Sequence, residues 1–312
     1  MSFVSPAPFP YKTSFIETTP QEFLHNLRNE KGLIEIVKGS KIFPIKMISD
    51  STVYEKVNII TDLYTEPVRM KARLSRKMSP IEFWTRDEKI IRKESRKRFG
   101  KEDNFSLRET IYLICKEATS FSPVLSKCIF DNLLPEKGGV VLDPFSGWGD
   151  RAIGALGSDR VLKYRGVDCN LELSESYKKI KTDLDATGKI DFTMCPFEDF
   201  KGEDDTYDLV FTSPPFFDFE VYSDDKSQSI SGKKNYGDWF DRWMTLVLNK
   251  IVRLVKHGGC IALHIGPTNR SPTLHDDVWE HLTKICKINY IQQIDCSVRG
   301  KRSIPIWVYR KD

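Results

Sequence analysis

From Gly138 to the end of the chain, short apolar runs alternate with helical segments, and this alternation is the strongest constraint on the fold. A run at 140–142 precedes a helix at 151–156, and a run at 164–168 precedes a helix at 171–185. Five more strands are predicted, at 192–194, 207–212, 260–265, 290–296 and 304–309. Strands that alternate with helices are typical of α/β proteins. We therefore expect a Rossmann-like, mostly parallel seven-stranded sheet with helices on both faces.

The beginning of the chain does not follow this alternation, and we interpret it as a mixed α+β extension. Two apolar runs at 33–37 and 42–46 flank the dipeptide Gly39-Ser40, which predicts a hairpin. At 312 residues the chain is long enough for one large domain or two modest ones. We predict an N-terminal extension over 1–117 and a larger domain over 118–312.

Basic residues are concentrated in one segment, although the net charge of the whole chain is only +4. Between Arg69 and Lys101 there are thirteen Lys or Arg residues against four Asp or Glu residues. Ser79 and Glu82 form a capping-box pattern, which predicts a helix that ends at Gly100. A basic helix is typical either of a solvated surface or of a nucleic-acid interface. The candidate phosphate contacts are Arg69, Lys71, Arg73, Arg76, Arg96, Lys97 and Arg98.

Composition excludes several classes of protein. No apolar run reaches the roughly 18 residues that a membrane span needs. The first residues lack the basic and apolar regions of a secretory signal. The seven cysteines include no C-x-x-C pair, which argues against a zinc site or a disulfide framework. We expect reduced thiols, no metal, no membrane contact and a cytoplasmic location.

A glycine-rich turn follows the first predicted strand of the larger domain. Its sequence, Asp143-Pro-Phe-Ser-Gly-Trp-Gly149, precedes a helix whose N-terminal N–H groups are free to bind a ligand. Asp168 lies nineteen residues after Gly149, at the end of the second strand, where a carboxylate can accept hydrogen bonds from a ribose. The pattern indicates either a nucleotide-like cofactor site or a tight structural turn.

A second motif, Ser213-Pro214-Pro215-Phe216, follows the fourth predicted strand. The carboxyl ends of parallel strands are where α/β sheets bind ligands. The prolines stiffen the loop and remove two N–H donors, so that the preceding carbonyls are held outward as acceptors. A hydroxyl and a carbonyl beside an aromatic ring suit the exocyclic amine of an extruded base. The alternative is a rigid turn with a core phenylalanine.

Together, the two motifs and their order resemble those of class I S-adenosylmethionine-dependent methyltransferases that act on adenine N6 or cytosine N4. In that family D-P-F-x-G-x-G follows the first strand and [DNS]-P-P-[YFW] follows the fourth, and both patterns are present without departure. Phe121 and Pro123 are similar to an F-x-P element of the family. The resemblance covers 118–312, and the layout is similar to amino-methyltransferases of phages and large DNA viruses.

The resemblance implies S-adenosyl-L-methionine as the cofactor and assigns residues to it. Phe121 would pack on its methionine end, and Asp168 would hold the ribose hydroxyls. An acidic or polar residue after the third strand contacts the adenine in the family, and Glu198 is the candidate here, beside Cys195 and Phe197. The glycine turn would line the methionine portion through Asp143, Pro144, Phe145, Gly147 and Gly149.

The resemblance also implies that the tetrapeptide holds the target base. Ser213, Pro214, Pro215 and Phe216 would form the catalytic site, with direct methyl transfer to the amino nitrogen. Tyr236, and Tyr222 with it, are candidates to cover the other face of the base. His264, in a predicted strand, is interpreted as a core or cleft residue. Cys195-Pro196 has the reverse of the order that carbon-5 cytosine methylation requires.

Four functional hypotheses stay open on the sequence. The first is a DNA amino-methyltransferase, and DNA is favoured over RNA as the partner. The second keeps the fold and cofactor but acts on RNA. The third is a catalytically silent, nucleic-acid-binding subunit, and a homodimer or a partner subunit is compatible with any of these. The fourth, a NAD-dependent oxidoreductase, leaves the Ser213–Phe216 motif unexplained.

Overall fold

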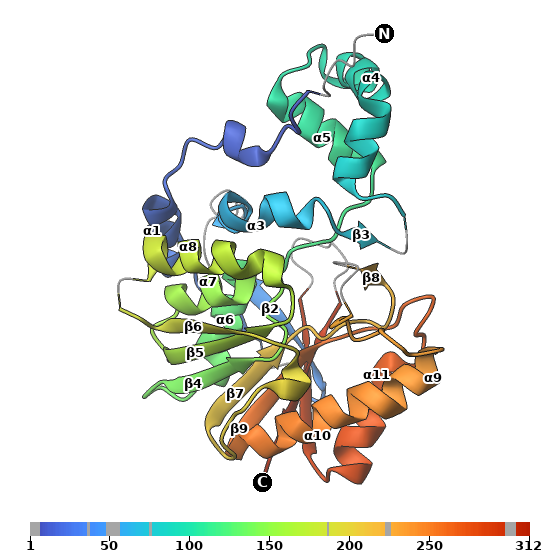
Figure 1. Cartoon of the computed structure of the whole chain (residues 1–312). Coiled ribbons are helices and arrows are strands. Elements are labelled where there is room, and N and C mark those ends of the chain that lie inside the picture. The colour runs from blue at the N-terminus through green and yellow to red at the C-terminus, as the bar shows by residue number, and fades with distance from the viewer. Residues whose placement is uncertain are drawn as a thin grey trace.

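The computed structural model describes residues 7–35, 38–47, 57–74, 77–185, 187–221, 226–296 and 304–312. Among these residues nine strands form one sheet, and its strand order is β1-β2-β10-β11-β9-β7-β4-β5-β6 (Figure 1). The strands are β1 (Gly32–Ile34), β2 (Ile42–Met47), β4 (Gly139–Asp143), β5 (Val161–Asp168), β6 (Ile190–Met194), β7 (Tyr207–Thr212), β9 (Val255–His264), β10 (Asn289–Asp295) and β11 (Ile306–Arg310).

The central part of the sheet has the doubly wound order that the alternation predicted. Strands β6, β5, β4, β7 and β9 are parallel, and the order reverses between β4 and β7. Strand β11 runs antiparallel between β9 and β10, as the predicted terminal hairpin requires. A reversal of strand order leaves a crevice at the carboxyl ends of the two strands beside it. The α/β, Rossmann-like fold is therefore confirmed.

The predicted number of seven strands is wrong, because the N-terminal segment adds two. The hairpin of β1 and β2 forms as predicted, with Leu33 opposite Lys46. Strand β2 then pairs in parallel with β10, so that Ile42 is opposite Gln293. This pairing joins two segments from opposite ends of the chain, and no local sequence pattern specifies it. The sheet is consequently continuous with the predicted N-terminal extension.

Helices cover both faces of the sheet (Figure 1). Helices α1, α6, α7 and α8 pack on one face, and α10 and α11 pack on the other. Neighbouring strand residues point to opposite faces, so that Val141 joins the first core and Leu142 the second. The helices are η1 (Lys12–Ser14), α1 (Pro20–Asn29), α3 (Asp62–Arg69), α4 (Pro80–Phe99), α5 (Asn104–Ile114), α6 (Pro123–Leu133), α7 (Asp150–Gly157), η2 (Leu171–Leu173), α8 (Ser174–Leu184), η3 (Phe197–Asp199), α9 (Tyr236–Trp239), η4 (Phe240–Met244), α10 (Thr245–Leu254), α11 (Leu274–Glu280) and η5 (His281–Ile285).

The basic helix forms as predicted and is α4. Ser79 caps it in a capping box with Glu82, and Gly100 ends it with a φ of 70°. Helices α4 and α5 pack around a small core of their own, centred on Trp84 and Ile91, and lie away from the sheet (Figure 1). Residues of α1, β2 and α3 belong to the core on one face of the sheet, and the domain boundary at residue 117 stays a prediction.

A buried ion-pair cluster connects the N-terminal elements. We use this name for Lys12, Asp62, Glu66, Arg69, Arg108 and Glu117. The Arg108 guanidinium donates to Glu66 at 2.7 Å and to Glu117 at 2.8 Å, and the side chains of Arg108 and Glu66 are fully buried. Arg69 pairs with Asp62 and donates to the carbonyl of Ala118 at 3.0 Å. The cluster fixes the segment that leads into the predicted F-x-P element.

A two-stranded ladder also joins the N-terminal part to the loop that follows the tetrapeptide. Strand β3 (Arg73–Leu74) pairs antiparallel with β8 (Glu220–Val221). The described helices include none that is both long and apolar enough to cross a membrane.

Candidate functional site

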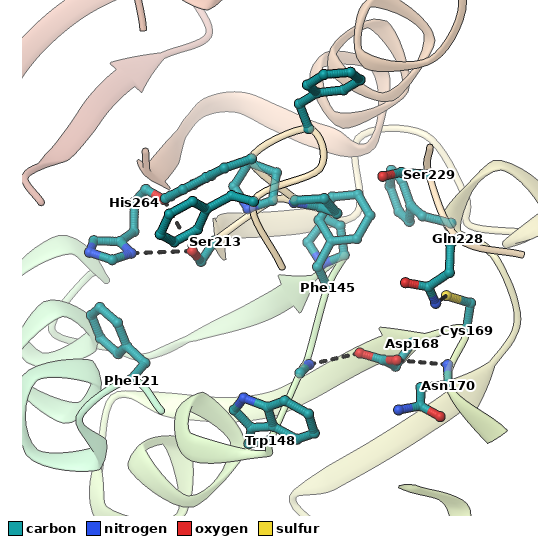
Figure 2. A pocket seen from close by; sticks show the side chains of 18 of the residues that line it. Phe121, Phe145, Trp148, Asp168, Cys169, Asn170, Ser213, Gln228, Ser229 and His264 are labelled. Atoms are coloured by element: carbon teal, nitrogen blue, oxygen red, sulfur yellow. Dashed lines mark hydrogen bonds between the residues drawn. The ribbon is translucent and has the colours of Figure 1, made fainter. Parts of the chain in front are cut away.

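A pocket opens at the carboxyl ends of β4, β5 and β7, at the point where the strand order reverses (Figure 2). Ten of the twelve residues predicted to be catalytic or cofactor-binding line it. These ten residues are Phe121, Pro144, Phe145, Gly147, Asp168, Glu198, Ser213, Pro214, Pro215 and Phe216. The two sequence motifs therefore meet in one cavity, although about seventy residues separate them in the chain. The roles assigned to these residues stay predictions.

Asp168 holds the glycine turn from the end of β5. One carboxylate oxygen accepts the N–H of Gly147 at 2.7 Å, and the other accepts the N–H of Asn170 at 2.8 Å (Figure 2). The turn needs a glycine at 147, because its φ is +56°. Burial raises the pKa of the Asp168 carboxyl to about 6, although the two backbone N–H groups lower it in part. The carboxylate thus lies in the pocket with acceptor capacity left for a ligand.

Two predicted cofactor contacts do not line the pocket, and we correct them. Asp143 is fully buried beneath it, where it accepts from Arg151 at 2.7 Å, from Tyr164 at 2.6 Å and from Thr212 at 2.7 Å. Its carboxylate is saturated by these partners and supports the turn from below. Gly149 is the N-cap of α7 and packs against helix α8, with a φ of +89°. Both residues shape the turn that carries Gly147 and Phe145.

Ser213 is anchored by His264, which ends β9. The Ser213 hydroxyl lies 3.2 Å from Nδ1 of His264 and donates to the carbonyl of the same residue at 3.2 Å (Figure 2). Burial and the nearby Arg151 guanidinium lower the pKa of the imidazole to about 3, so that it is neutral at physiological pH. When the hydroxyl proton points to the carbonyl, the neutral ring donates from Nδ1. One lone pair of Oγ then stays available to a substrate.

Aromatic rings surround this pair of residues. The ring of Phe121 packs edge-on against His264, with 4.9 Å between the ring centres. Phe145 packs against Phe197 and Trp243 on the other side of the cavity. Glu198 accepts a hydrogen bond from the indole of Trp243, which fixes its carboxylate at the pocket wall. The cavity is therefore largely apolar, with a few fixed polar groups, as ligand sites usually are.

Sequence reasoning missed part of the lining. The loop after β8 contributes Ser227–Ile230, and Gln228 lies beside Cys169, with 3.9 Å from its amide nitrogen to the sulfur (Figure 2). No chemical pattern in these residues distinguishes them from other polar loops. His264 was interpreted as a core or cleft residue, and the structure places it in the pocket against Ser213.

Asp150, the first residue of α7, is another buried acid of the pocket that sequence reasoning missed. One of its oxygens accepts the N–H of Phe121 at 3.2 Å, and the other has no hydrogen-bond partner among the described residues. Burial raises the pKa of its carboxyl to about 7. The Thr61 hydroxyl lies near this carboxyl and lowers its pKa in part. Asp150 is therefore a buried acid at the pocket wall whose second oxygen can accept a further donor.

The predicted phosphate contacts differ in their availability. The prediction for Arg69 is wrong, because its side chain is only 3% exposed and belongs to the buried ion-pair cluster. Arg76 lies outside the described residues. The other five are accessible but paired with acids, namely Lys71 with Glu172, Arg73 with Glu82, Arg96 with Glu102, and Lys97 and Arg98 with Glu94.

Tyr236 lies beside the pocket rather than in it. Its hydroxyl donates to Asp277 at 2.6 Å, and its ring packs against Phe217, which does line the pocket. Tyr222 lies outside the described residues. The role of Tyr236 at the target base stays a prediction.

The chain matches no protein-family model and no curated protein sequence. Solved structures of similar architecture include a tRNA m1G37 methyltransferase of Methanocaldococcus jannaschii, at 16% identity and a TM-score of 0.41. That match covers 62% of this chain and 51% of the other, so it spans about half of that methyltransferase.

Two further solved structures illustrate the variety among such matches. One is a geranyl diphosphate methyltransferase, at 11% identity and a TM-score of 0.42, with 60% of this chain and 78% of that chain covered. The other is the [4+2]-cyclase SpnF, at 13% identity and a TM-score of 0.44, with 61% and 81% covered.

Proposed function

We propose that the protein is a methyltransferase that uses S-adenosyl-L-methionine. More specifically, we propose that it methylates the exocyclic amine of a base, cytosine N4 or adenine N6, in DNA. The observation that carries the proposal is that the Asp168-held glycine turn and the Ser213–Phe216 motif line a single cavity. The first suits a nucleoside cofactor, and the second suits an amine acceptor. An oxidoreductase would leave the second without a role.

The pocket residues fit the chemistry of this cofactor. Asp168 would accept the ribose hydroxyls, and two backbone N–H groups, from Gly147 and Asn170, already fix the orientation of its carboxylate. The second oxygen of Asp150, near Phe121, suits the α-ammonium group of the methionine portion. Phe145, Phe197 and Trp243 provide apolar surface for the adenine, beside the fixed carboxylate of Glu198. The ribose hydroxyls, the α-ammonium group and the adenine thus each have a proposed partner in the pocket.

The residues of the tetrapeptide orient the acceptor amine. Ser213 Oγ and the Pro214 carbonyl accept its N–H groups, and Phe216 offers a ring face to the base. When bound, S-adenosylmethionine supplies a methyl carbon to which the amine nitrogen bonds, while the carbon–sulfur electron pair stays on sulfur and one amine proton leaves to water. The chain contributes orientation and fixed dipoles that stabilise the positive charge developing on nitrogen. His264 keeps the Ser213 hydroxyl in the accepting orientation.

Affinity for S-adenosylmethionine is expected to rise with pH between about 5 and 7. The pKa of Asp168 is raised to about 6, and the carboxyl accepts the ribose hydroxyls at full strength only when ionised, above that pH. The pKa of Asp150, raised to about 7, extends the increase upward, because ionised Asp150 attracts the ammonium group. At pH 5 about a tenth of Asp168 is ionised, so the affinity for S-adenosylmethionine should be at least about tenfold weaker at pH 5 than at pH 7.

Isothermal titration calorimetry across this pH range measures the effect. The variant Asp168→Asn should bind weakly at every pH and lose the part of the increase centred near 6. The variant Asp199→Asn, outside the pocket, should keep the whole increase. A wild-type affinity that is flat from pH 5 to 8 would contradict the assignment of Asp168.

The decisive experiment for the function is transfer of tritiated methyl groups from S-adenosylmethionine to duplex DNA, single-stranded DNA and RNA. Digestion of the product to nucleosides then identifies the modified atom. We expect N4-methylcytosine or N6-methyladenine in DNA. Label in RNA alone would reassign the substrate, and cofactor binding without label in any polymer would favour a silent subunit.

A further inference from the structure

A second cavity lies directly beside the first and shares two lining residues with it. Its volume is about 380 Å³, within the range of roughly 300–1,000 Å³ that is usual for ligand sites. Phe217 and Ile230 line both cavities, so the two cavities are neighbours. The remaining lining residues are Asp218, Lys233, Lys234, Asn235, Tyr236 and Arg270.

The charge of this second cavity favours an anion. Three cationic side chains line it, against one carboxylate. The carboxylate of Asp218 is buried and already paired with Arg270, at 2.9 Å. Lys233 and Lys234 form no ion pair among the described residues, in contrast to Arg96, Lys97 and Arg98 of α4. The carboxylate of Asp238 accepts the backbone N–H of Lys234 at 2.9 Å and pairs with Arg242, so it lies near Lys234 without pairing with its ammonium group. Phosphate binding to the two lysines therefore displaces no ion pair of their side chains among the described residues.

The wall between the two cavities is rigid and strained. Phe217 follows the tetrapeptide directly and has a φ of +58°, a left-handed conformation that bulky residues rarely adopt. Its ring packs against Tyr236 and the fully buried Trp239, with 6.0 and 5.7 Å between ring centres. Asp277 fixes Tyr236 in turn, through a hydrogen bond of 2.6 Å. The packing holds an aromatic wall at the boundary between the two cavities.

We infer that the second cavity binds the phosphodiester next to the target nucleotide of a polynucleotide. This inference rests on the proposed function, because it places the target base against Ser213 in the first cavity. The sugar–phosphate chain would then pass Phe217, and the neighbouring phosphate would meet Lys233 and Lys234. Phe217 and Tyr236 would contact the flanking sugar or base, since aromatic rings stack on any base. The target is thus an extruded nucleotide of a strand rather than a free small molecule.

The test is the affinity for single-stranded dC6 and dA6, measured by fluorescence anisotropy at several salt concentrations. The variant Lys233→Glu/Lys234→Glu should bind at least tenfold more weakly than the wild type. Loss of two phosphate contacts should also reduce the slope of log affinity against log salt by about 1.4. Arg270 is left intact, because its removal would leave Asp218 buried and unpaired. Thermal unfolding confirms that the variant is folded.

Two comparison variants make the result specific. Lys178→Glu/Lys179→Glu changes the charge equally on exposed α8 lysines, whose side chains are 68% and 63% exposed, and should change affinity less than twofold. Arg96→Glu/Lys97→Glu/Arg98→Glu tests the proposed phosphate contacts of α4 and should weaken longer strands more than the hexanucleotides. An effect at Lys233 and Lys234 no larger than that of the α8 control would overturn the inference.

Further outcomes separate this inference from the proposed function. Suppose that hexanucleotide binding depends on Lys233 and Lys234 but no polymer is methylated. This result would contradict the proposed function and support the phosphate site. If polymers are methylated and the variant Lys233→Glu/Lys234→Glu methylates them as fast as the wild type, the proposed function is supported and the phosphate site is contradicted. Binding of pyrophosphate without any binding of dC6 or dA6 would point to a small phosphorylated substrate and overturn the inference.

Discussion

Replacing Ser213 by alanine is expected to lower kcat for methyl transfer by about 10²–10³-fold. The Ser213 hydroxyl is held by His264 at 3.2 Å from both Nδ1 and the backbone carbonyl, so its free lone pair has a fixed direction. A fixed dipole of this kind needs no reorientation as positive charge develops on the amine. Its loss removes stabilisation that is made mainly in the transition state, and it therefore lowers kcat more than it raises KM.

Affinity for the cofactor provides the internal control for this prediction. It should be unchanged in Ser213→Ala, because the cofactor is assigned to Asp168, Asp150 and the glycine turn. Ser174→Ala on α8, the same chemical change outside the pocket, should keep full activity. His264→Gln retains a donor toward Ser213 and should lose less activity than His264→Phe. A kcat for Ser213→Ala within threefold of the wild type would remove the serine from the mechanism.

The sequence located the two motifs but not the contacts that support them. Each motif is contiguous in the chain, and the alternation of strands and helices placed both at carboxyl ends of strands. Asp143 was predicted to contact the cofactor. Its actual partners, Tyr164 and Thr212, come from two other strands, and the sequence does not show that they meet Asp143. The contact between Ser213 and His264 follows from the register of β7 and β9. Thr212 is opposite Leu263 in this parallel pair, so the next residues, Ser213 and His264, lie side by side. That register was not assigned from the sequence alone.

The basic segment shows a second reason why composition alone misleads. Arg69 was grouped with surface cations, yet it pairs with Asp62 seven residues earlier, on the same face of α3. That spacing is visible in the sequence, but its burial against Ala118 is not. Two cations of α4, Arg92 and Arg96, likewise pair with Glu102, which lies just beyond the segment. A local charge excess therefore overstated the charge that is available to phosphate.

Replacing Arg108 by methionine is expected to lower the free energy of unfolding by about 3–5 kcal/mol. Arg108 and Glu66 are fully buried, and Arg108 also donates twice to Glu117. Without the guanidinium, both carboxylates stay in a low-dielectric interior with too few donors. Burial already raises the pKa of Glu66, so the variant should take up a proton there as it folds. Urea denaturation at pH 7 measures the loss.

The matched control for this variant is Arg96→Met. Arg96 also pairs with a glutamate, but its side chain is 62% exposed, so the substitution should cost less than about 1 kcal/mol. A second variant, Glu66→Gln/Arg108→Met, removes one of the stranded charges and should recover part of the lost stability. Equal stabilities of Arg108→Met and Arg96→Met would show that the buried ion-pair cluster does not hold the N-terminal elements in place.

The parallel pairing of β2 with β10 has a consequence for biosynthesis. A ribosome releases the residues of β2 early, but their partners only after most of the chain has been made. At about 5–20 residues per second, the growing polypeptide waits roughly ten to fifty seconds before that edge can close. During this time the hairpin can dock on α6, where Asn132 donates to the carbonyl of Gly32 at 3.0 Å. Truncated products that lack the last two strands would therefore present an open sheet edge and should aggregate.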